Sequence, residues 1–463
     1  MSNDLFREFE AVSAKEWKQK IQVDLKGADY NETLIWQSLE GINVKPFYHP
    51  DDFSGILPPI PGHPKSWNVA QDIFIDSEKI ANNLALDAVN RGAESIIFSS
   101  EKEFDPIMFF QDFPFEKASV YFKFSFLSTS FFSLLNNFLK DKNATVFYNI
   151  DIVGNLAKSG NWFFNLKEDY KALDQILSEQ PNGNIIGIDA TLYQNAGANM
   201  VQQLAYALSH ANEYLNHLHN NDFSKENKTP LNVTFTLAIG SNYFFEIAKI
   251  LALRKLYALL AKEYNLDETC HILAVPSKRN KTIYDYNVNM LRTTTECMSA
   301  VLGGANTISN LAYDNVYHKS NEFGERISRN QLLILKAESY FDTVSNAADG
   351  TYYIESLTSQ LAEKALTLFK EIEKSGGFLS ALKEGIIQRK IKDSAKKEQS
   401  MFDEGKLKLL GTNFHQNKEE KMGDDIQLFP FIKSNPRKTL IEPIIEKRLA
   451  EKTEQQRLNT EKL

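Results

Sequence analysis

NIIGIDATLYQNAGANM, residues 184–200, combines a buried-strand pattern with a polar turn. The apolar run at 185–188 ends in a polar cluster that includes Asp189, Thr191 and Gln194. Gly197 follows, and a helical pattern begins after it. In α/β enzymes, polar side chains gathered where a buried strand ends often carry the chemistry. The stretch therefore predicts one strand–turn–helix unit and raises the question of whether its polar end is an active site.

The same unit recurs along the chain. Short β-rich runs occupy 69–75, 95–100, 118–125, 144–150, 184–191, 232–240, 270–277 and 306–312, and amphipathic segments such as 197–218, 243–264, 287–302 and 322–339 lie between them. Apolar strands separated by helices are typical of a parallel sheet that is covered on its faces. Eight units favour a closed (β/α)8 barrel of the TIM type over an open doubly wound sheet, and no GxGxxG opens the first helix.

The two ends of the chain differ from this repeat. Residues 1–65 predict an N-terminal arm, because dense proline at 41–67 favours extended backbone and the apolar residues need another surface to cover them. The barrel is expected over 66–345. Residues 346–463 predict a C-terminal helical extension whose last segment, from residue 440, forms a polar amphipathic helix.

Composition excludes several classes of protein. A net charge of −8 argues against a nucleic-acid partner. Two cysteines, Cys270 and Cys297, cannot form a disulfide framework. The N-terminus has no apolar signal region, and the most apolar helical segment, 244–261, contains four charged residues, so we expect no membrane span and a cytoplasmic location.

Common catalytic and metal motifs are weak or absent in the sequence. His210, His217 and His219 lie seven and two residues apart, which is not the spacing of helical metal ligands. Cys270 and His271 are adjacent on a predicted strand and so point to opposite faces. Arg292 and Glu296 are four apart, which fits either an exposed helix pair or a barrel mouth.

Six longer segments carry a more specific signal. They are 24–48, 195–215, 238–260, 289–308, 326–365 and 440–449, and they include NMLRTTTECMSAVLGGANTI at 289–308. In this order they resemble the methylmalonyl-CoA mutases, adenosylcobalamin-dependent isomerases built on a (β/α)8 barrel. The resemblance spans nearly the whole chain and implies the same barrel that the strand count predicts.

The resemblance also shows where this chain departs from the catalytic members of the family. Their fifth strand ends Tyr-His-Met-Gln-Glu-Ala-Gly, whereas residues 191–197 read TLYQNAG. Leu192 thus replaces the family histidine, and Asn195 replaces the glutamate. A leucine can neither hydrogen-bond nor transfer a proton, so we expect no catalytic residue here. The retained cofactor-binding candidates are Gln194, Ala196, Gly197 and Glu296, with no metal ligand among them.

Other family positions depart in the same direction. Trp67 and Gln71 match a family segment that binds acyl-CoA, but Val69-Ala70 stand where the family has Ile-Arg, and the substrate carboxylate loses its guanidinium. Lys278 stands where a family glycine lets the cofactor approach. His415 lies outside any D-x-H-x-x-G motif, so we expect no cobalamin-binding domain.

Together these departures imply a non-catalytic small (beta) subunit of a bacterial heterodimer in propionate metabolism. A homologous large subunit would bind adenosylcobalamin and interconvert (R)-methylmalonyl-CoA and succinyl-CoA, while this chain would bind no cofactor. The isolated chain could also form a homodimer. The alternatives are an acyl-CoA-binding barrel of a split mutase that works with a separate cobalamin-binding chain, and a stand-alone acyl-CoA-binding or regulatory barrel. A barrel filled with bulky side chains favours the non-catalytic subunit, and an open channel for the pantetheine arm would oppose it.

Overall fold

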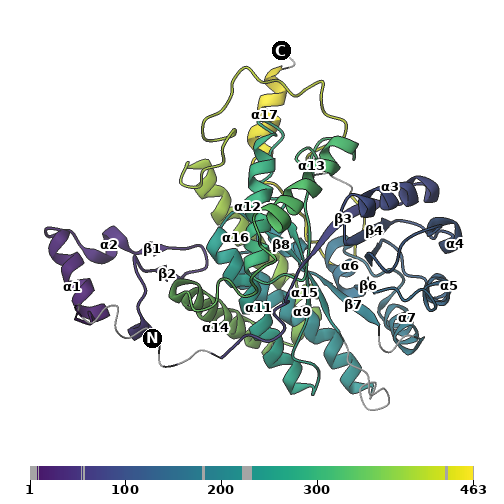
Figure 1. Ribbon diagram of the computed structural model, residues 1–463, viewed down its shortest axis with the longest axis horizontal. Coiled ribbons are helices and arrows are strands. Elements are labelled where there is room, and N and C mark those ends of the chain that lie inside the picture. Colours follow the sequence, from purple (N-terminus) through teal and green to yellow (C-terminus); the bar gives the residue numbers. More distant parts are fainter. Residues whose placement is uncertain are drawn as a thin grey trace.

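The centre of the molecule is a closed barrel of eight strands (Figure 1). A computed structural model describes residues 8, 10–53, 55, 58–179, 183–221, 232–432 and 436–461. All neighbouring strands of the barrel are parallel. In barrel order they are β3 (Asn68–Phe74), β4 (Ser95–Ser100), β5 (Ser119–Phe124), β6 (Val146–Ile150), β7 (Asn184–Asp189), β8 (Thr234–Ile239), β9 (His271–Pro276) and β10 (Thr307–Ser309). The predicted (β/α)8 barrel is therefore confirmed.

Helices surround the barrel on its outer side (Figure 1). They are α3 (Glu78–Asn90), α4 (Pro106–Phe109), α5 (Thr129–Leu139), α6 (Ile152–Ser159), α7 (Leu166–Glu179), α8 (Thr191–Asn195), α9 (Met200–Asn220), α11 (Tyr243–Glu263), α12 (Val288–Leu302) and α13 (Glu322–Leu333). Polar residues that follow the strands start several of them: Ser128 caps α5, Asp151 caps α6 and Asn199 forms a capping box on α9. The loops that carry these caps meet at the carboxyl-terminal end of the strands, which we call the mouth.

The N-terminal arm lies mostly outside the barrel (Figure 1). It contains α1 (Ala14–Asp24), α2 (Tyr30–Leu34) and the two short strands β1 (Trp36–Gln37) and β2 (Asn43–Val44), followed by the 3₁₀ turn η1 (Pro50–Asp52). Ile42 and Val44 are buried in the main core, and the Trp36 and Phe245 rings pack edge to face with their centroids 5.7 Å apart. In contrast, α1 buries none of its side chains, and Trp17 and Val23 are 49% and 72% exposed. The described contacts of α1 are with the arm itself: the Trp17 ring lies 6.4 Å from the Phe47 ring, centroid to centroid, and the Ala14 N–H donates to Asp51.

The C-terminal part adds further helices. α14 (Tyr352–Lys374) contacts both α9 and α11, α15 (Gly377–Lys383) contacts α9 and α14, and α16 (Ile386–Asp403) contacts α15. Leu458 of α17 (Glu451–Glu461) packs in a separate cluster with Ile283 and Tyr284. Leu357, Leu361 and Ala365 are buried on one face of α14, as their spacing predicts. Among the described residues, no helix combines the length and apolarity that crossing a bilayer requires.

One prediction for this part is wrong. Residues 440–449, which we call the strap, are not helical, and only Glu451–Glu461 forms the expected last helix. Pro443 lacks a donor for a helical hydrogen bond. The strap's backbone N–H groups instead bind distant segments: Ile444 donates to the Ala157 carbonyl of α6, Lys447 to the Asn195 carbonyl of α8 and Leu449 to the Arg279 carbonyl. Tertiary hydrogen bonds at the mouth therefore replace the helical ones.

Candidate functional site

Leu192 lies on α8, just beyond the end of β7, and its side chain belongs to the main apolar core with 4% exposure. The neighbouring Tyr193 hydroxyl lies 2.9 Å from His210 Nδ1, and His210 Nε2 lies 2.8 Å from Asp151 Oδ1. His210 is fully buried in this network. Within the described ranges, no group of three His, Cys, Asp or Glu residues could hold a metal ion. The side chain at the family histidine position is thus a packing residue.

Gln194 is part of a buried ion-pair cluster. The Lys249 ammonium donates to Gln194 Oε1 at 2.8 Å and to Gln203 Oε1 at 3.0 Å, and it lies 2.5 Å from Glu246 Oε2. Burial lowers the pKa of Lys249, and Glu246 partly offsets this effect. The Gln194 amide therefore compensates a buried charge and is not free to bind a ligand.

Asn195 joins three segments at the mouth. Its side-chain carbonyl accepts hydrogen bonds of 3.0 Å from the Ser277 hydroxyl and the Lys278 backbone N–H. Its amide donates to Glu446 of the strap, and its backbone carbonyl accepts from Lys447. The asparagine that replaces the family glutamate thus connects the loops after β7 and β9 to the strap.

Ala196 and Gly197 form the turn between α8 and α9. Ala196 is 7% exposed, and Gly197 has a φ of +99°, which favours glycine. A Cβ at Gly197 would lie 2.5 Å from the Ala395 Cβ and 2.9 Å from the Arg279 guanidinium. The glycine is therefore required by the turn and by the approach of α16, without any cofactor.

Glu296 lies on α12 and is 1% exposed. Both of its carboxylate oxygens accept from the Lys281 ammonium, at 2.9 and 2.8 Å, and Asn280 donates at 2.7 Å. Burial raises the pKa of Glu296 and lowers that of Lys281, while their attraction opposes both shifts. Arg292 instead donates to the Leu410 carbonyl. Of the two alternatives for Arg292 and Glu296, the exposed helix pair is therefore wrong.

The barrel interior is filled below the mouth by what we call the aromatic layer: Tyr121, Phe147 and His271. The Tyr121 and Phe147 rings stack with their centroids 4.3 Å apart and their planes at 3°, and the centroids of the Phe147 and His271 rings are also 4.3 Å apart. The Tyr121 hydroxyl lies 2.8 Å from both His271 Nε2 and Thr307 Oγ1. Burial lowers the pKa of His271 to about 3, so the imidazole is neutral. Bulky rings thus cross the axis of the barrel.

Smaller side chains complete the aromatic layer. Ala70, Ile97 and Leu273 are buried in the same cluster as Tyr121 and Phe147. Ala70 is the residue that stands where the family has arginine. The layer was not predicted from the sequence, although the period-2 alternation in SVYFKF (119–124) places Tyr121 and Lys123 on one face of the strand.

Trp67 and Gln71, the two retained residues of the acyl-CoA segment, are held by helix α13 and the segment after it. The Trp67 indole N–H donates to the Phe341 carbonyl at 3.3 Å. The Gln71 amide donates to Glu325, and its carbonyl accepts from Arg329 at 2.8 Å. Desolvation raises the pKa of Glu325 to about 7. Both side chains therefore stabilise the packing of the segments around the barrel.

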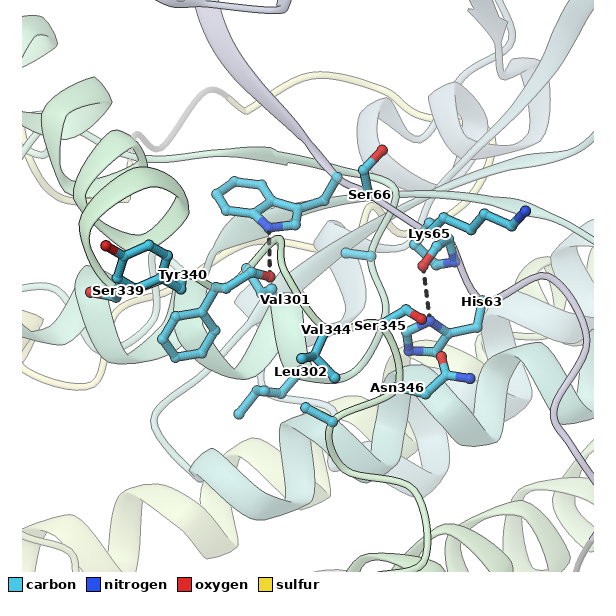
Figure 2. Close-up of a pocket in the computed structure, with 15 residues that line it drawn as sticks. His63, Lys65, Ser66, Val301, Leu302, Ser339, Tyr340, Val344, Ser345 and Asn346 are labelled. Carbon is cyan, nitrogen blue, oxygen red and sulfur yellow. Dashed lines mark hydrogen bonds between the residues drawn. The ribbon is translucent and has the colours of Figure 1, made fainter.

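A cavity of about 280 Å³ lies at the opposite end of the barrel from the mouth (Figure 2). Its walls come from residues 63–67 before β3, from Val301, Leu302 and Ala305 near the end of α12, and from the loop 339–347. Figure 2 shows Tyr340 and Leu302 on one side of it and His63 with Asn346 on the other. Leu192, Gln194 and Glu296 do not line it. No pattern in the sequence predicts this cavity.

We expect Lys281→Met to lower the free energy of unfolding by about 3–5 kcal/mol, because it leaves the Glu296 carboxylate buried without a cation. Urea unfolding measures this change. Lys281→Met combined with Glu296→Met should recover most of the loss. The matched control, Lys392→Met, removes an exposed pair with Glu442 and should cost less than about 1 kcal/mol. A loss of under about 1 kcal/mol for Lys281→Met would contradict the structural role of Glu296.

We also expect Glu325→Gln to change the pH dependence of stability. The folded-state pKa of Glu325, about 7, lies above its ordinary value, so this group favours folding at low pH and loses that contribution as the pH rises through 7. The variant should match the wild type near about pH 5 and exceed it by about 1–2 kcal/mol near about pH 8. Thermal and urea unfolding at both pH values check this. Glu363→Gln, at an exposed site on α14, should show no such difference; an equal effect of both variants would refute the prediction.

Comparisons with known proteins agree with these features. The family model described as Methylmalonyl-CoA mutase matches residues 105–459. A methylmalonyl-CoA mutase small subunit from Porphyromonas gingivalis is 35% identical over 99% of this chain and 78% of its own length. The methylmalonyl-CoA mutase of Rhizobium meliloti is 27% identical over 89% of the chain, and the human mitochondrial enzyme is 26% identical over 88%. The chain spans only 65% and 61% of the lengths of these two mutases.

The matched family model covers most of the barrel and the C-terminal part, and the similarity to a small subunit extends over nearly every residue. The chain therefore belongs to the methylmalonyl-CoA mutase family.

Proposed function

We propose that this chain is the non-catalytic small subunit of a heterodimeric methylmalonyl-CoA mutase. A homologous large subunit binds adenosylcobalamin and interconverts (R)-methylmalonyl-CoA and succinyl-CoA. The small subunit stabilises the folded large subunit by binding it, because a partner that binds only the folded state shifts the equilibrium toward that state.

The aromatic layer is the observation that carries this proposal. Tyr121 is fully buried and Phe147 is 7% exposed, and the two rings fill the axis of the barrel. An extended acyl-CoA chain cannot pass through a barrel whose interior is closed by packed rings. The same layer counts against the acyl-CoA-binding barrel of a split mutase.

The residues at the mouth do not fit adenosylcobalamin. Leu192 has no polar side-chain atom, and the side-chain oxygens of Gln194 and Glu296 already accept hydrogen bonds from Lys249 and Lys281. Lys278 places a long, exposed side chain where the resemblance requires glycine. The chemistry of the cofactor therefore belongs to the partner subunit.

The arm is the proposed contact with the large subunit. The helix α1 buries no side chain, and Trp17, which packs against Phe47 on one side, is still 49% exposed and available to a second surface. Tryptophan is also among the residues that contribute most to binding at protein interfaces. The proposed boundaries are an arm at 1–65, a barrel at 66–345 and a C-terminal extension at 346–463.

Co-purification with a large mutase subunit from the same organism tests the proposal. We expect the two chains to elute as a one-to-one complex, and mutase activity to require the large subunit with adenosylcobalamin. Trp17→Ala should weaken the complex by about tenfold or more. Phe164→Ala, at a 65% exposed site on the barrel, is the matched control and should leave the complex unchanged.

Two results would overturn the proposal. The first is activity from this chain mixed only with an isolated cobalamin-binding domain, because that would make its barrel catalytic. The second is the absence of any complex between the two full chains.

A further inference from the structure

The cavity of about 280 Å³ at the opposite end of the barrel from the mouth has unpaired hydrogen-bond acceptors in its wall. Two buried atoms of residues that line it, His63 Nε2 and Asn346 Oδ1, have no hydrogen-bond partner among the described residues. Figure 2 shows these two side chains beside each other on the same side of the cavity. Because buried polar groups in folded proteins are nearly always paired, two unpaired acceptors at one cavity indicate a site for a hydrogen-bond donor.

The protonation of His63 follows from its surroundings. Its Nδ1 lies 3.2 Å from the Pro64 carbonyl oxygen, which can only accept a hydrogen bond, so Nδ1 carries the proton and Nε2 has a free lone pair. Burial lowers the pKa of His63, and the positive charge of Arg254 adds to this effect, against the hydrogen bond to Pro64. The imidazole is therefore neutral at pH 7, and its Nε2 is an acceptor.

Gly304, in the turn between α12 and β10, holds the His63 ring in place. Its φ is +81°, and a Cβ there would lie 2.5 Å from both Nε2 and Cδ2 of His63 and 3.0 Å from Cε1. These distances place Gly304 over the face of the imidazole, because an approach in the ring plane would leave Cε1 much farther away than Nε2. The lone pair of Nε2, which lies in the ring plane, therefore does not point at Gly304. Arg254 fixes the turn by donating to the Gly304 carbonyl at 2.7 and 3.2 Å.

The rest of the cavity wall is mainly apolar. Trp67 is 3% exposed, and the hydrogen bond from its indole N–H to the Phe341 carbonyl fixes its ring. Tyr340 and Val344 also line the cavity but are 70% and 64% exposed, so a ligand there would cover apolar surface that now faces solvent. Among the described residues of the wall, only Lys65 carries a charge, and this residue is exposed. The wall therefore suits a neutral and mainly apolar ligand.

We propose that this cavity binds a neutral two-ring aromatic molecule with an N–H donor, of the indole class. A cavity of about 150 Å³ holds benzene, so one of about 280 Å³ suits a two-ring molecule. The ligand N–H donates to His63 Nε2, beside Asn346 Oδ1, and its rings pack against Trp67 and Leu302. An anion is repelled by the two acceptor atoms, and a cation is repelled by the nearby Arg254. The site goes beyond the proposed subunit role and does not depend on it.

Calorimetric titration of the full chain with indole and with 1-methylindole, which lacks the N–H, tests this site. We expect saturable binding of indole that is about tenfold or more tighter than that of 1-methylindole, because only indole donates to the buried acceptor. His63→Phe keeps a ring but removes the acceptor, so it should weaken indole about tenfold and make the two ligands bind alike. The comparison of both ligands on both proteins separates the hydrogen bond from the extra size of the methyl group.

Leu302→Trp places a larger side chain in the cavity wall and should weaken both ligands about tenfold or more. His219→Phe, at an exposed histidine of α9 that does not line the cavity, is the control and should bind like the wild type. Circular dichroism and the melting temperature establish that the variants fold. The proposal is refuted if indole gives no saturable heat, if 1-methylindole binds as tightly as indole, or if His63→Phe and Leu302→Trp leave the affinities unchanged. None of these results depends on the large mutase subunit.

Discussion

The stacking of Tyr121 on Phe147, with the Tyr121 hydroxyl between His271 and Thr307, is the contact on which the rest of the structure depends. It fills the barrel axis with aromatic rings and satisfies the buried hydroxyl. Because His271 is held neutral, the layer adds no uncompensated charge to the interior. A packed barrel of this kind is a stable scaffold, and the same packing removes the space that a long acyl thioester needs.

The mouth follows a similar rule, because the family's functional positions have structural partners there. Gln194 stabilises Lys249, Asn195 holds the strap and Glu296 neutralises Lys281. Groups that hold buried partners are rigid and costly to free, since removing one member of a buried pair leaves the other unsatisfied. The positions that the resemblance marks as catalytic or cofactor-binding thus stabilise this subunit.

Much of this could be predicted from the sequence. Eight apolar runs separated by amphipathic segments predict the barrel, because a buried parallel strand leaves a clear pattern. The loss of catalysis that Leu192 indicates stays a prediction, based on a side chain with no proton to transfer. The partners of Gln194 and Glu296 could not be predicted, because Lys249 and Lys281 meet them only through tertiary packing. The strap was wrongly predicted as a helix. Its backbone donors bind distant segments, and the periodicity of a sequence does not reveal such tertiary hydrogen bonds. The stacking across the barrel axis also depends on the relative register of β5, β6 and β9, which one strand's pattern does not fix.

The most direct test of the closed barrel is the binding of succinyl-CoA to the purified chain without its partner, measured by calorimetry. A barrel whose axis is filled by Tyr121 and Phe147 predicts no saturable binding. Micromolar binding of succinyl-CoA that is lost when Ala70 in the barrel interior is changed to a bulky residue would contradict it, because that ligand would then occupy the axis that the aromatic layer is inferred to close.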